Sequence, residues 1–207
     1  MSLAGFTIKD FDTMAVPGLE PRMEALITNV RPKLESIGSE ITPFLSALTG
    51  DEMFAHVAKH ARRTINPPND TWVAWSSSKR GYKALPHFQV GLFSTHLFIV
   101  YAVIYESSNK EVIGRYLEQH AGDIKSQVPE AFYWSMDHMT PGGRLNAEIT
   151  EAELAEMGTK LQKVKKSELL CGLSLPRGSA QAENGEQLEE LIRSTFETLL
   201  PLYRVSF

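Results

Sequence analysis

The chain has 207 residues, of which 43% are hydrophobic and 22% are charged, and its formal net charge is -4. This composition is typical of a folded protein with a substantial core and excludes wholesale disorder, and the length favours one domain spanning residues 1–207. A single cysteine excludes an intramolecular disulfide and fits a reducing compartment. Residues 97–105, the longest apolar run, are too few to cross a membrane, and residues 1–12 lack the apolar segment of a signal peptide. We therefore expect a cytoplasmic protein without a membrane partner.

Helical periodicity dominates the first fifty residues. Apolar residues recur at three- and four-residue steps from Leu19 to Ile37, which predicts an amphipathic helix. Pro32 removes a hydrogen bond within this stretch and predicts a kink or a break before it. A shorter helix is predicted over residues 41–48, with Gly50 as its end.

The middle of the chain is rich in aromatic and β-branched residues and predicts strands. These strands are expected over residues 71–76, 87–93 and 97–105, separated by proline, glycine, serine and basic clusters. The last of them is apolar on both faces, which is typical of a central strand covered on both sides. Residues 54–63 suit a strand or the last turns of a helix, and we favour the strand.

The remaining segments return to helix. Helices are predicted from Ser108 or Asn109 to Gly122, from Thr150 to Val164 and over residues 186–200, with a strand over residues 168–175. Thr150 and Glu153 form a capping-box pattern, and Pro201 is expected to stop the last helix. Helices at both ends with consecutive strands between them predict an α+β fold, with a mostly antiparallel sheet of about five strands.

The positive charge is concentrated in one part of this acidic chain. Residues 53–105 contain six basic residues and one acidic residue, whereas the rest contains 15 basic and 24 acidic residues. Four of the six histidines also lie there. Solvated charges at strand ends, which keep sheets from pairing with neighbours, are one interpretation. An anion-binding site is the other.

The first basic group lies in residues 54–63. In a strand, the two-residue period puts His56, His60 and Arg62 on one face, and Lys59 and Arg63 on the other. In a helix, His56 and His60 share a side as an i, i+4 pair. Either geometry brings the two imidazoles together.

The second basic group lies in the connection that leads into the strand at residue 87. Its candidate ligand-binding residues are Lys79, Arg80, Tyr82, Lys83, His87 and Gln89. Gly81 permits backbone conformations that expose N–H groups, and a guanidinium such as that of Arg80 can hold a phosphate with two hydrogen bonds. His87 and Gln89 share one face of the strand, which suggests that they line a cleft or meet solvent.

These two groups predict a pocket that binds an anionic, phosphate-bearing small molecule or a nucleotide. Basic residues interleaved with aromatic rings such as Trp72, Trp75 and Phe88 also fit single-stranded nucleic acid, but the overall acidity of the chain argues against it. An acidic protein partner is a third interpretation. The sequence specifies no cofactor, catalytic residue or oligomeric state.

Two catalytic hypotheses involve the histidines. His56 or His60 could meet His87 and cleave a phosphate ester by acid–base catalysis, with the basic side chains stabilising the phosphoryl oxygens. A zinc site would need His56 and His60 together with Asp70 or His87, but the pair lacks the pattern of a metalloprotease helix, so we expect no metal.

A local hydrolase triad is not expected. In an extended segment Ser135 and Asp137 face one way and His138 the other, and triad members normally come from separate elements. Asp137 and His138 can still face the basic region from a neighbouring strand. Cys171 lies in an apolar run, which is typical of a buried, unreactive thiol.

Several segments carry a resemblance to a known family. They are HVAKHARR at 56–63, NPPNDTWVAW at 66–75, KRGYKALPHFQVGL at 79–92, LFIVYAVIYE at 97–106, SMDHM at 135–139 and LPLY at 200–203. Together they resemble the YktB-like family of uncharacterised bacterial proteins, over nearly the whole chain. The resemblance implies a single cytoplasmic α+β domain without an established activity, so no residue role is transferred from it.

Overall fold

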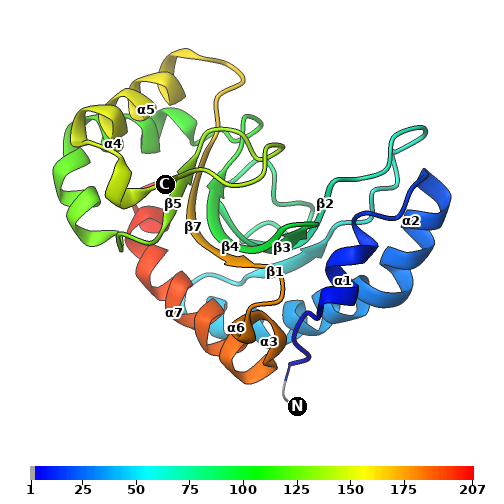
Figure 1. Cartoon of the computed structure of the whole chain (residues 1–207). Coiled ribbons are helices and arrows are strands. Elements are labelled where there is room, and N and C mark those ends of the chain that lie inside the picture. Colours follow the sequence, from blue (N-terminus) through cyan, green and yellow to red (C-terminus); the bar gives the residue numbers. More distant parts are fainter. Residues whose placement is uncertain (1–2) are drawn as a thin grey trace.

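One curved sheet organises residues 3–207, the residues that the computed structural model describes (Figure 1). Its seven strands are β1 (Phe54–Val57), β2 (Asp70–Ser76), β3 (His87–Phe93), β4 (His96–Val103), β5 (Tyr133–Ser135), β6 (Arg144–Leu145) and β7 (Leu169–Pro176). They lie in the order β1-β2-β3-β4-β7-β5-β6, and every neighbouring pair is antiparallel. The sheet forms a trough with a convex and a concave side.

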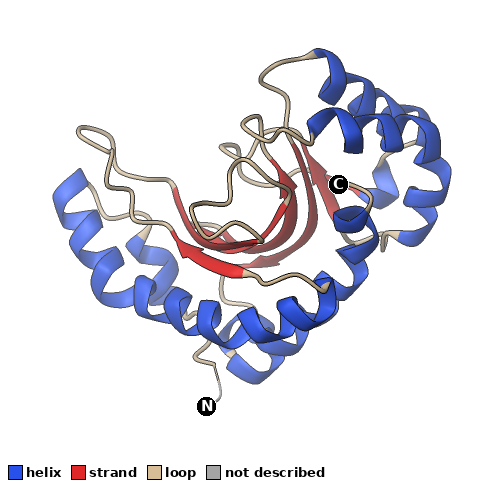
Figure 2. Ribbon diagram, turned by 180° about the vertical axis from the view of Figure 1, so that it is seen from behind, coloured by secondary structure: helices blue, strands red, loops and turns tan. Residues whose placement is uncertain are grey.

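Helices cover the convex side, whereas loops cross the concave side (Figure 2). The helices are α1 (Ile8–Thr13), α2 (Leu19–Ala25), the π-helical turn η1 (Leu26–Val30), α3 (Arg31–Thr49), α4 (Lys110–Gln127), the 3-10 turn η2 (Asn146–Glu148), α5 (Glu151–Lys163), α6 (Ala180–Glu183) and α7 (Gly185–Arg204). α3 contacts β1 and β2, and α7 contacts β3, β4 and β7. α4 and α5 pack against each other beside the β5 end of the sheet (Figure 1).

The main core lies between the convex face and the helices. Trp75 of β2 is fully buried there, and its indole nitrogen donates a 3.1 Å hydrogen bond to Oγ1 of Thr42 in α3. Its ring also meets that of Phe196 in α7 at a centroid distance of 5.7 Å. Alternate residues of each strand point to this side, so the intervening residues face the trough.

The concave face combines a shallow floor with an apolar cluster. A second hydrophobic cluster consists of Phe93, Phe98, Val100, Ala102, Tyr133 and Leu170, with Trp72 packed against it. Gly91 pairs with Phe98, and Gly172 pairs with Tyr133. Because the two glycines add no side chain to this face, the larger residues around them leave a hollow.

The structure confirms the predicted α+β fold and the central strand, since β4 is buried along its whole length. The predicted number of five strands is wrong, because the very short β5 and β6 have too few residues to show a period. The predicted strand over residues 54–63 is also too long. β1 ends at Val57, and His60 has a positive φ of 51°, which a continuous strand does not allow.

The prolines within the helices have different effects on helix continuity. The π-helical turn ahead of Arg31 agrees with the expected break near Pro32. The helices predicted on either side of residue 40 are one helix, because α3 continues through Pro43 to Thr49. α7 likewise continues through Pro201 and buries Leu202 and Tyr203, so the apolar contacts of its last turn outweigh the lost hydrogen bond.

The end of α4 also differs from the prediction. The helix passes Gly122 and ends at Gln127, which buries Ile124 against the core. The predicted capping box of α5 is confirmed, because the Thr150 side chain accepts a hydrogen bond from the backbone N–H of Glu153. Among the described residues, no helix combines the length and apolar character needed to cross a bilayer.

Candidate functional site

A pocket opens on the concave side of the sheet, with an empty volume of about 530 Å³ including its mouth. Its apolar wall consists of Trp72, Phe93, Phe98, Ile104, Tyr133 and Leu170, and its polar lining consists of Asp70, Tyr82, Lys83, Gln89, Ser135, Asp137, His138 and Thr140. The residues come from β2, β3, β4, β5 and β7, from Ile104 directly after β4, and from the loops at residues 77–86 and 136–143.

Gln89 lies at the floor of the pocket and is held by His87. The His87 ring is fully buried, and its Nδ1 lies 2.8 Å from the carbonyl oxygen of Leu85, which can only accept a hydrogen bond. Nδ1 therefore carries the proton, and Nε2 accepts a 2.8 Å hydrogen bond from the Gln89 amide nitrogen. Burial lowers the pKa of His87 to about 4, which agrees with a neutral ring.

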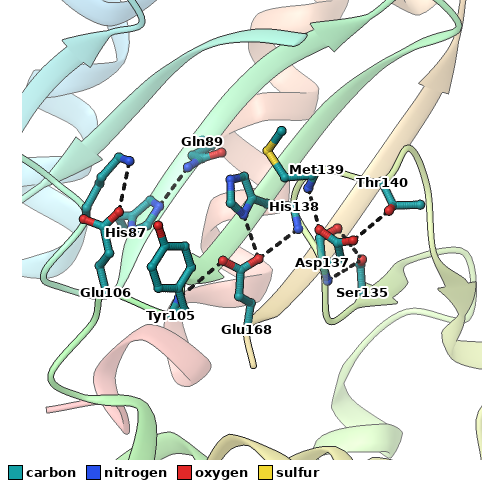
Figure 3. Close-up of polar contacts among 11 residues, drawn as sticks. His87, Gln89, Tyr105, Glu106, Ser135, Asp137, His138, Met139, Thr140 and Glu168 are labelled. Atoms are coloured by element: carbon teal, nitrogen blue, oxygen red, sulfur yellow. Dashed lines mark hydrogen bonds and ion pairs between the residues drawn. The ribbon is translucent and has the colours of Figure 1, made fainter. Parts of the chain in front are cut away.

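This arrangement sets the direction of the Gln89 amide. Its nitrogen faces His87, so its oxygen faces the other way, towards the side on which His138 lies (Figure 3). Gln89 thus offers the pocket a hydrogen-bond acceptor in a fixed position.

Tyr82 has a similar constraint. Its hydroxyl accepts a 2.9 Å hydrogen bond from the indole nitrogen of Trp72, and its ring lies at a centroid distance of 4.8 Å from His87. Burial raises the pKa of Tyr82 to about 12. The hydroxyl therefore keeps its own proton, which is available for donation to a ligand.

His138 reaches the pocket from the loop that follows β5. Its Nδ1 lies 2.7 Å from Oε2 of Glu168, and the same oxygen accepts a 3.0 Å hydrogen bond from the His138 backbone N–H (Figure 3). Glu168 is 3% exposed and also accepts from the backbone N–H of Tyr105. The hydrogen bond to Glu168 raises the pKa of His138. Burial acts to raise the pKa of Glu168, but the hydrogen bonds from His138 lower it below its usual value.

Asp70 is the second titratable group deep in the pocket. It is the first residue of β2 and is 4% exposed. Burial raises its pKa to about 6, although the positive charges of His138 and Arg63 act in the opposite direction. A carboxyl and an imidazole with altered pKa values in one pocket are typical of functional sites.

Asp137 shapes the loop around His138. Its carboxylate accepts hydrogen bonds from the backbone N–H of Met139 at 2.8 Å and from the Thr140 hydroxyl at 2.7 Å. Within residues 3–207, Asp137, His138 and Glu168 place three potential metal ligands within 4.8 Å of one another. Asp137 accepts the two hydrogen bonds above, and Oε2 of Glu168 accepts two from His138, so these contacts hold the loop around His138 in place.

The structure brings together only part of the second predicted basic group. Tyr82, Lys83 and Gln89 line the pocket, with His87 beneath Gln89. Lys83 also pairs with Glu106 at 3.1 Å. Lys79 and Arg80 are exposed in the connection between β2 and β3 and are not part of the lining.

The first predicted basic group lies outside the pocket lining. His56 packs near Tyr82 at a centroid distance of 5.9 Å, and its Nε2 lies 2.9 Å from the Ser78 carbonyl oxygen. His60 contacts the Thr71 hydroxyl and the edge of Trp72, and burial lowers its pKa to about 4. Lys59, Arg62 and Arg63 belong to the loop after β1, where Lys59 and Arg62 are exposed and Arg63 is partly buried.

The sequence indicates Asp70 only as a possible zinc ligand and His138 only as a residue that can face the basic region, and it gives no role to Glu168. Asp70 is the single acidic residue of the basic middle segment, which was a usable signal. Glu168 directly precedes the apolar strand β7, where a buried acid needs a partner. Its pairing with a histidine 30 residues earlier depends on the contact of β5 with β7, which no local pattern reports.

Comparisons with known proteins agree over the whole chain. The family model described as a domain of unknown function, DUF1054, matches residues 6–203. A UPF0637 protein of Bacillus velezensis is 50% identical over 206 residues, covering 100% of this chain and 98% of the relative. A UPF0637 protein of Bacillus licheniformis is 47% identical with the same coverage, and one of Bacillus cereus is 46% identical over 203 residues, 98% of both chains. These matches confirm the resemblance to an uncharacterised bacterial family.

Proposed function

Since this chain belongs to the DUF1054 family, described as a domain of unknown function, we propose a function from the pocket itself. The pocket binds a nucleotide-like small molecule, with its planar ring against the aromatic wall and one phosphate group beside Lys83 and His138. The observation that carries the proposal is the Gln89 amide, fixed by His87 at the floor of a pocket walled by aromatic rings.

The apolar wall supports the placement of the ring. Trp72, Phe93, Phe98 and Tyr133 contribute aromatic surfaces, which stack favourably on a planar heterocycle. A purely apolar ring would leave the Gln89 amide oxygen without a partner, which is unfavourable in a buried position. A heterocycle with a hydrogen-bond donor on its edge satisfies both requirements.

The charges at the pocket support a single phosphate. Lys83 and His138 line the pocket, and Arg63 lies close enough to Asp70 to lower its pKa. Asp70 and Asp137 line the same pocket and repel additional negative charge. We therefore expect a monophosphate or a phosphodiester to bind better than a di- or triphosphate.

Thermal unfolding and calorimetry with AMP, CMP, GMP and UMP test the proposal. At least one mononucleotide should raise Tm in a concentration-dependent manner, because a ligand that binds only the folded state stabilises it. The matching nucleoside and inorganic phosphate should each bind more weakly. Gln89→Leu should weaken binding by roughly tenfold, which corresponds to a lost hydrogen bond of about 1.4 kcal/mol. Gln181→Leu, on the exposed side of α6, is the matched control.

Two results contradict the proposal. One is the absence of binding by all four mononucleotides. The other is affinity that grows with oligonucleotide length and falls steeply with salt, which would indicate an extended nucleic-acid surface.

A further inference from the structure

We propose that Asp70 and His138 are a catalytic base and a catalytic acid, which cleave a phosphodiester whose neighbouring sugar carbon carries a hydroxyl group. This inference rests on the proposed function, because the substrate is the same nucleotide-like class extended by an esterified phosphate.

The position of His138 is fixed for proton transfer. Glu168 holds Nδ1 at 2.7 Å and, through the backbone N–H of His138, also holds the loop that carries the ring. Among residues 3–207, no hydrogen-bond partner occupies Nε2, which points away from Glu168 and towards the side on which Gln89 lies (Figure 3). A histidine with one nitrogen bonded to a carboxylate and the other directed to a pocket is suited to donate a proton from that second nitrogen.

Asp70 approaches the same pocket from a different element. It begins β2, whereas His138 follows β5, and both side chains line the pocket. Each affects the protonation of the other. Within the described residues, no other side chain donates a hydrogen bond to the Asp70 carboxylate. Its oxygens are therefore free to accept a proton from a bound hydroxyl.

A phosphodiester with an adjacent hydroxyl requires these two groups. The Asp70 carboxylate takes the proton of the 2′-hydroxyl, and that oxygen forms a bond to phosphorus. The bond from phosphorus to the 5′-oxygen breaks with its electron pair, and the leaving oxygen takes the Nε2 proton of His138. The products are a 2′,3′-cyclic phosphate and a free 5′-hydroxyl. A proton then passes through solvent from Asp70 to His138, which restores both groups without a further reactant.

Cations near the pair stabilise the transition state. Lys83 lines the pocket, and Arg63 acts on Asp70 electrostatically. Positive groups aimed at the phosphoryl oxygens stabilise the charge that develops there.

The surrounding charges agree with this assignment of roles. His138 faces Glu168, Asp70 and Asp137, which all favour its protonated form. Asp70 faces His138 and Arg63, and burial raises its pKa to about 6. Asp70 is ionised above about pH 6, and the raised pKa of His138 keeps its ring protonated to a higher pH than an ordinary histidine, so the two working forms coexist between the two pKa values. Cleavage should therefore show a bell-shaped pH profile.

Four ribodinucleotides, ApA, CpC, GpG and UpU, and their 2′-deoxy analogues are the probes. Calorimetry measures the binding of the deoxy analogues, which lack the attacking hydroxyl, and chromatography measures the cyclic phosphate formed from the ribodinucleotides between pH 5 and 9. At least one ribodinucleotide should be cleaved, and its deoxy analogue should bind without being cleaved.

Variants separate catalysis from binding and folding. Asp70→Asn and His138→Asn should each lower kcat by about 100-fold or more, within the range of acid–base catalysis, and still bind the deoxy analogue. Asparagine at 138 keeps an N–H donor for Glu168 but has no second nitrogen for the substrate. Glu168→Gln should shift the descending limb of the pH profile to lower pH, as expected for a positioning residue. His120→Gln, on α4 outside the pocket, should keep the wild-type rate.

Each outcome decides between the two proposals. If no dinucleotide and no mononucleotide binds, the proposed function and this inference both fail. If the deoxy analogues bind but wild-type protein forms no cyclic phosphate at any pH, the inference fails and the proposed function stands. Cleavage that persists in folded Asp70→Asn or His138→Asn protein also overturns the assignment of these residues.

Discussion

The His87 Nε2 atom accepts a 2.8 Å hydrogen bond from the Gln89 amide, and this contact determines which end of the amide faces the pocket. The orientation of the amide depends on Leu85, two residues before His87, because the Leu85 carbonyl oxygen requires a proton on Nδ1 of the His87 ring. The Leu85 carbonyl oxygen thereby determines, through the buried His87 imidazole, which end of the Gln89 amide faces the pocket. The side chains of His87 and Gln89 lie on the same strand face, so the chain builds this relay within five residues.

Gln89→Glu tests this relay. The carboxylate has nearly the same shape as the amide but no hydrogen to donate, so His87 Nε2 would face a negative oxygen without a proton between them. We expect a stability loss of about 1–3 kcal/mol at pH 8, the usual range for an unsatisfied buried polar group. Protonation of His87 restores a hydrogen bond, so the loss should diminish at pH 5.5. Urea denaturation at both pH values measures this, and an equal loss at both would contradict the relay.

The buried histidines predict sensitivity to acid. The pKa of His87 is about 4 in the folded protein because burial disfavours its charged form, against an ordinary value of 6.5. Between these values the unfolded chain binds more protons, so the free energy of unfolding falls as the pH drops from 6.5 to 4. Asp70, with a folded-state pKa of about 6 against 3.8, contributes the opposite sign over pH 4 to 6.

His87→Phe isolates the contribution of this ring. The variant should be less stable at pH 7, because the Leu85 carbonyl and the Gln89 amide lose their partner, but its stability should fall less steeply between pH 6.5 and 4 than that of the wild type. Chemical denaturation at half-unit pH steps gives both slopes. His120→Phe, at a partly exposed position on α4, should retain the wild-type slope. Parallel slopes for wild type and His87→Phe would show that His87 does not cause the acid sensitivity.

The pairing of Glu168 with His138 predicts a shifted imidazole titration. The hydrogen bond to Glu168 raises the pKa of His138, so its stabilising contribution is complete below 6.5 and is lost as the pH rises through its folded-state pKa. In Glu168→Gln the midpoint of the His138 ring resonances, followed by NMR, should move to lower pH. Glu111→Gln, an exposed acid on α4, should leave that midpoint unchanged. A midpoint that stays in place in Glu168→Gln would mean that the contact does not form in solution.

Local sequence patterns predict the parts of the fold that depend on local physics. The aromatic and β-branched runs of β2, β3 and β4 identify these strands within one or two residues, because their burial pattern follows directly from residue type. The capping box of α5 is equally local. The shared face of His87 and Gln89 follows from the two-residue period and places Gln89 at the pocket.

The predicted basic residues do not all lie at this pocket, because charge along the chain does not report direction in space. His60 leaves the strand period through a positive φ, so Lys59 and Arg62 turn into an exposed loop. The contact of His138 with Glu168 requires β5 and β7 to pair, and a three-residue strand such as β5 gives no readable period. The contact between Glu168 and His138 is therefore visible only in three dimensions.

Gly91→Ala tests whether the shallow floor of the trough shapes the pocket. A Cβ at this position would clash with the Phe98 ring and would lie 2.5 Å from the Thr71 carbonyl oxygen and 2.7 Å from the Trp72 Cβ. Phe98 and Trp72 are pocket walls, so they must shift, and we expect a stability loss of about 1–3 kcal/mol, typical of overpacking. Because the walls move, mononucleotide affinity should fall even at temperatures where the variant is fully folded. Gly81→Ala is the matched control, since a Cβ there meets nothing within 4 Å, and its Tm should stay within the error of the wild type. Unchanged stability and affinity in Gly91→Ala would show that the neighbouring residues accommodate the added methyl group and that Gly91 does not define the hollow.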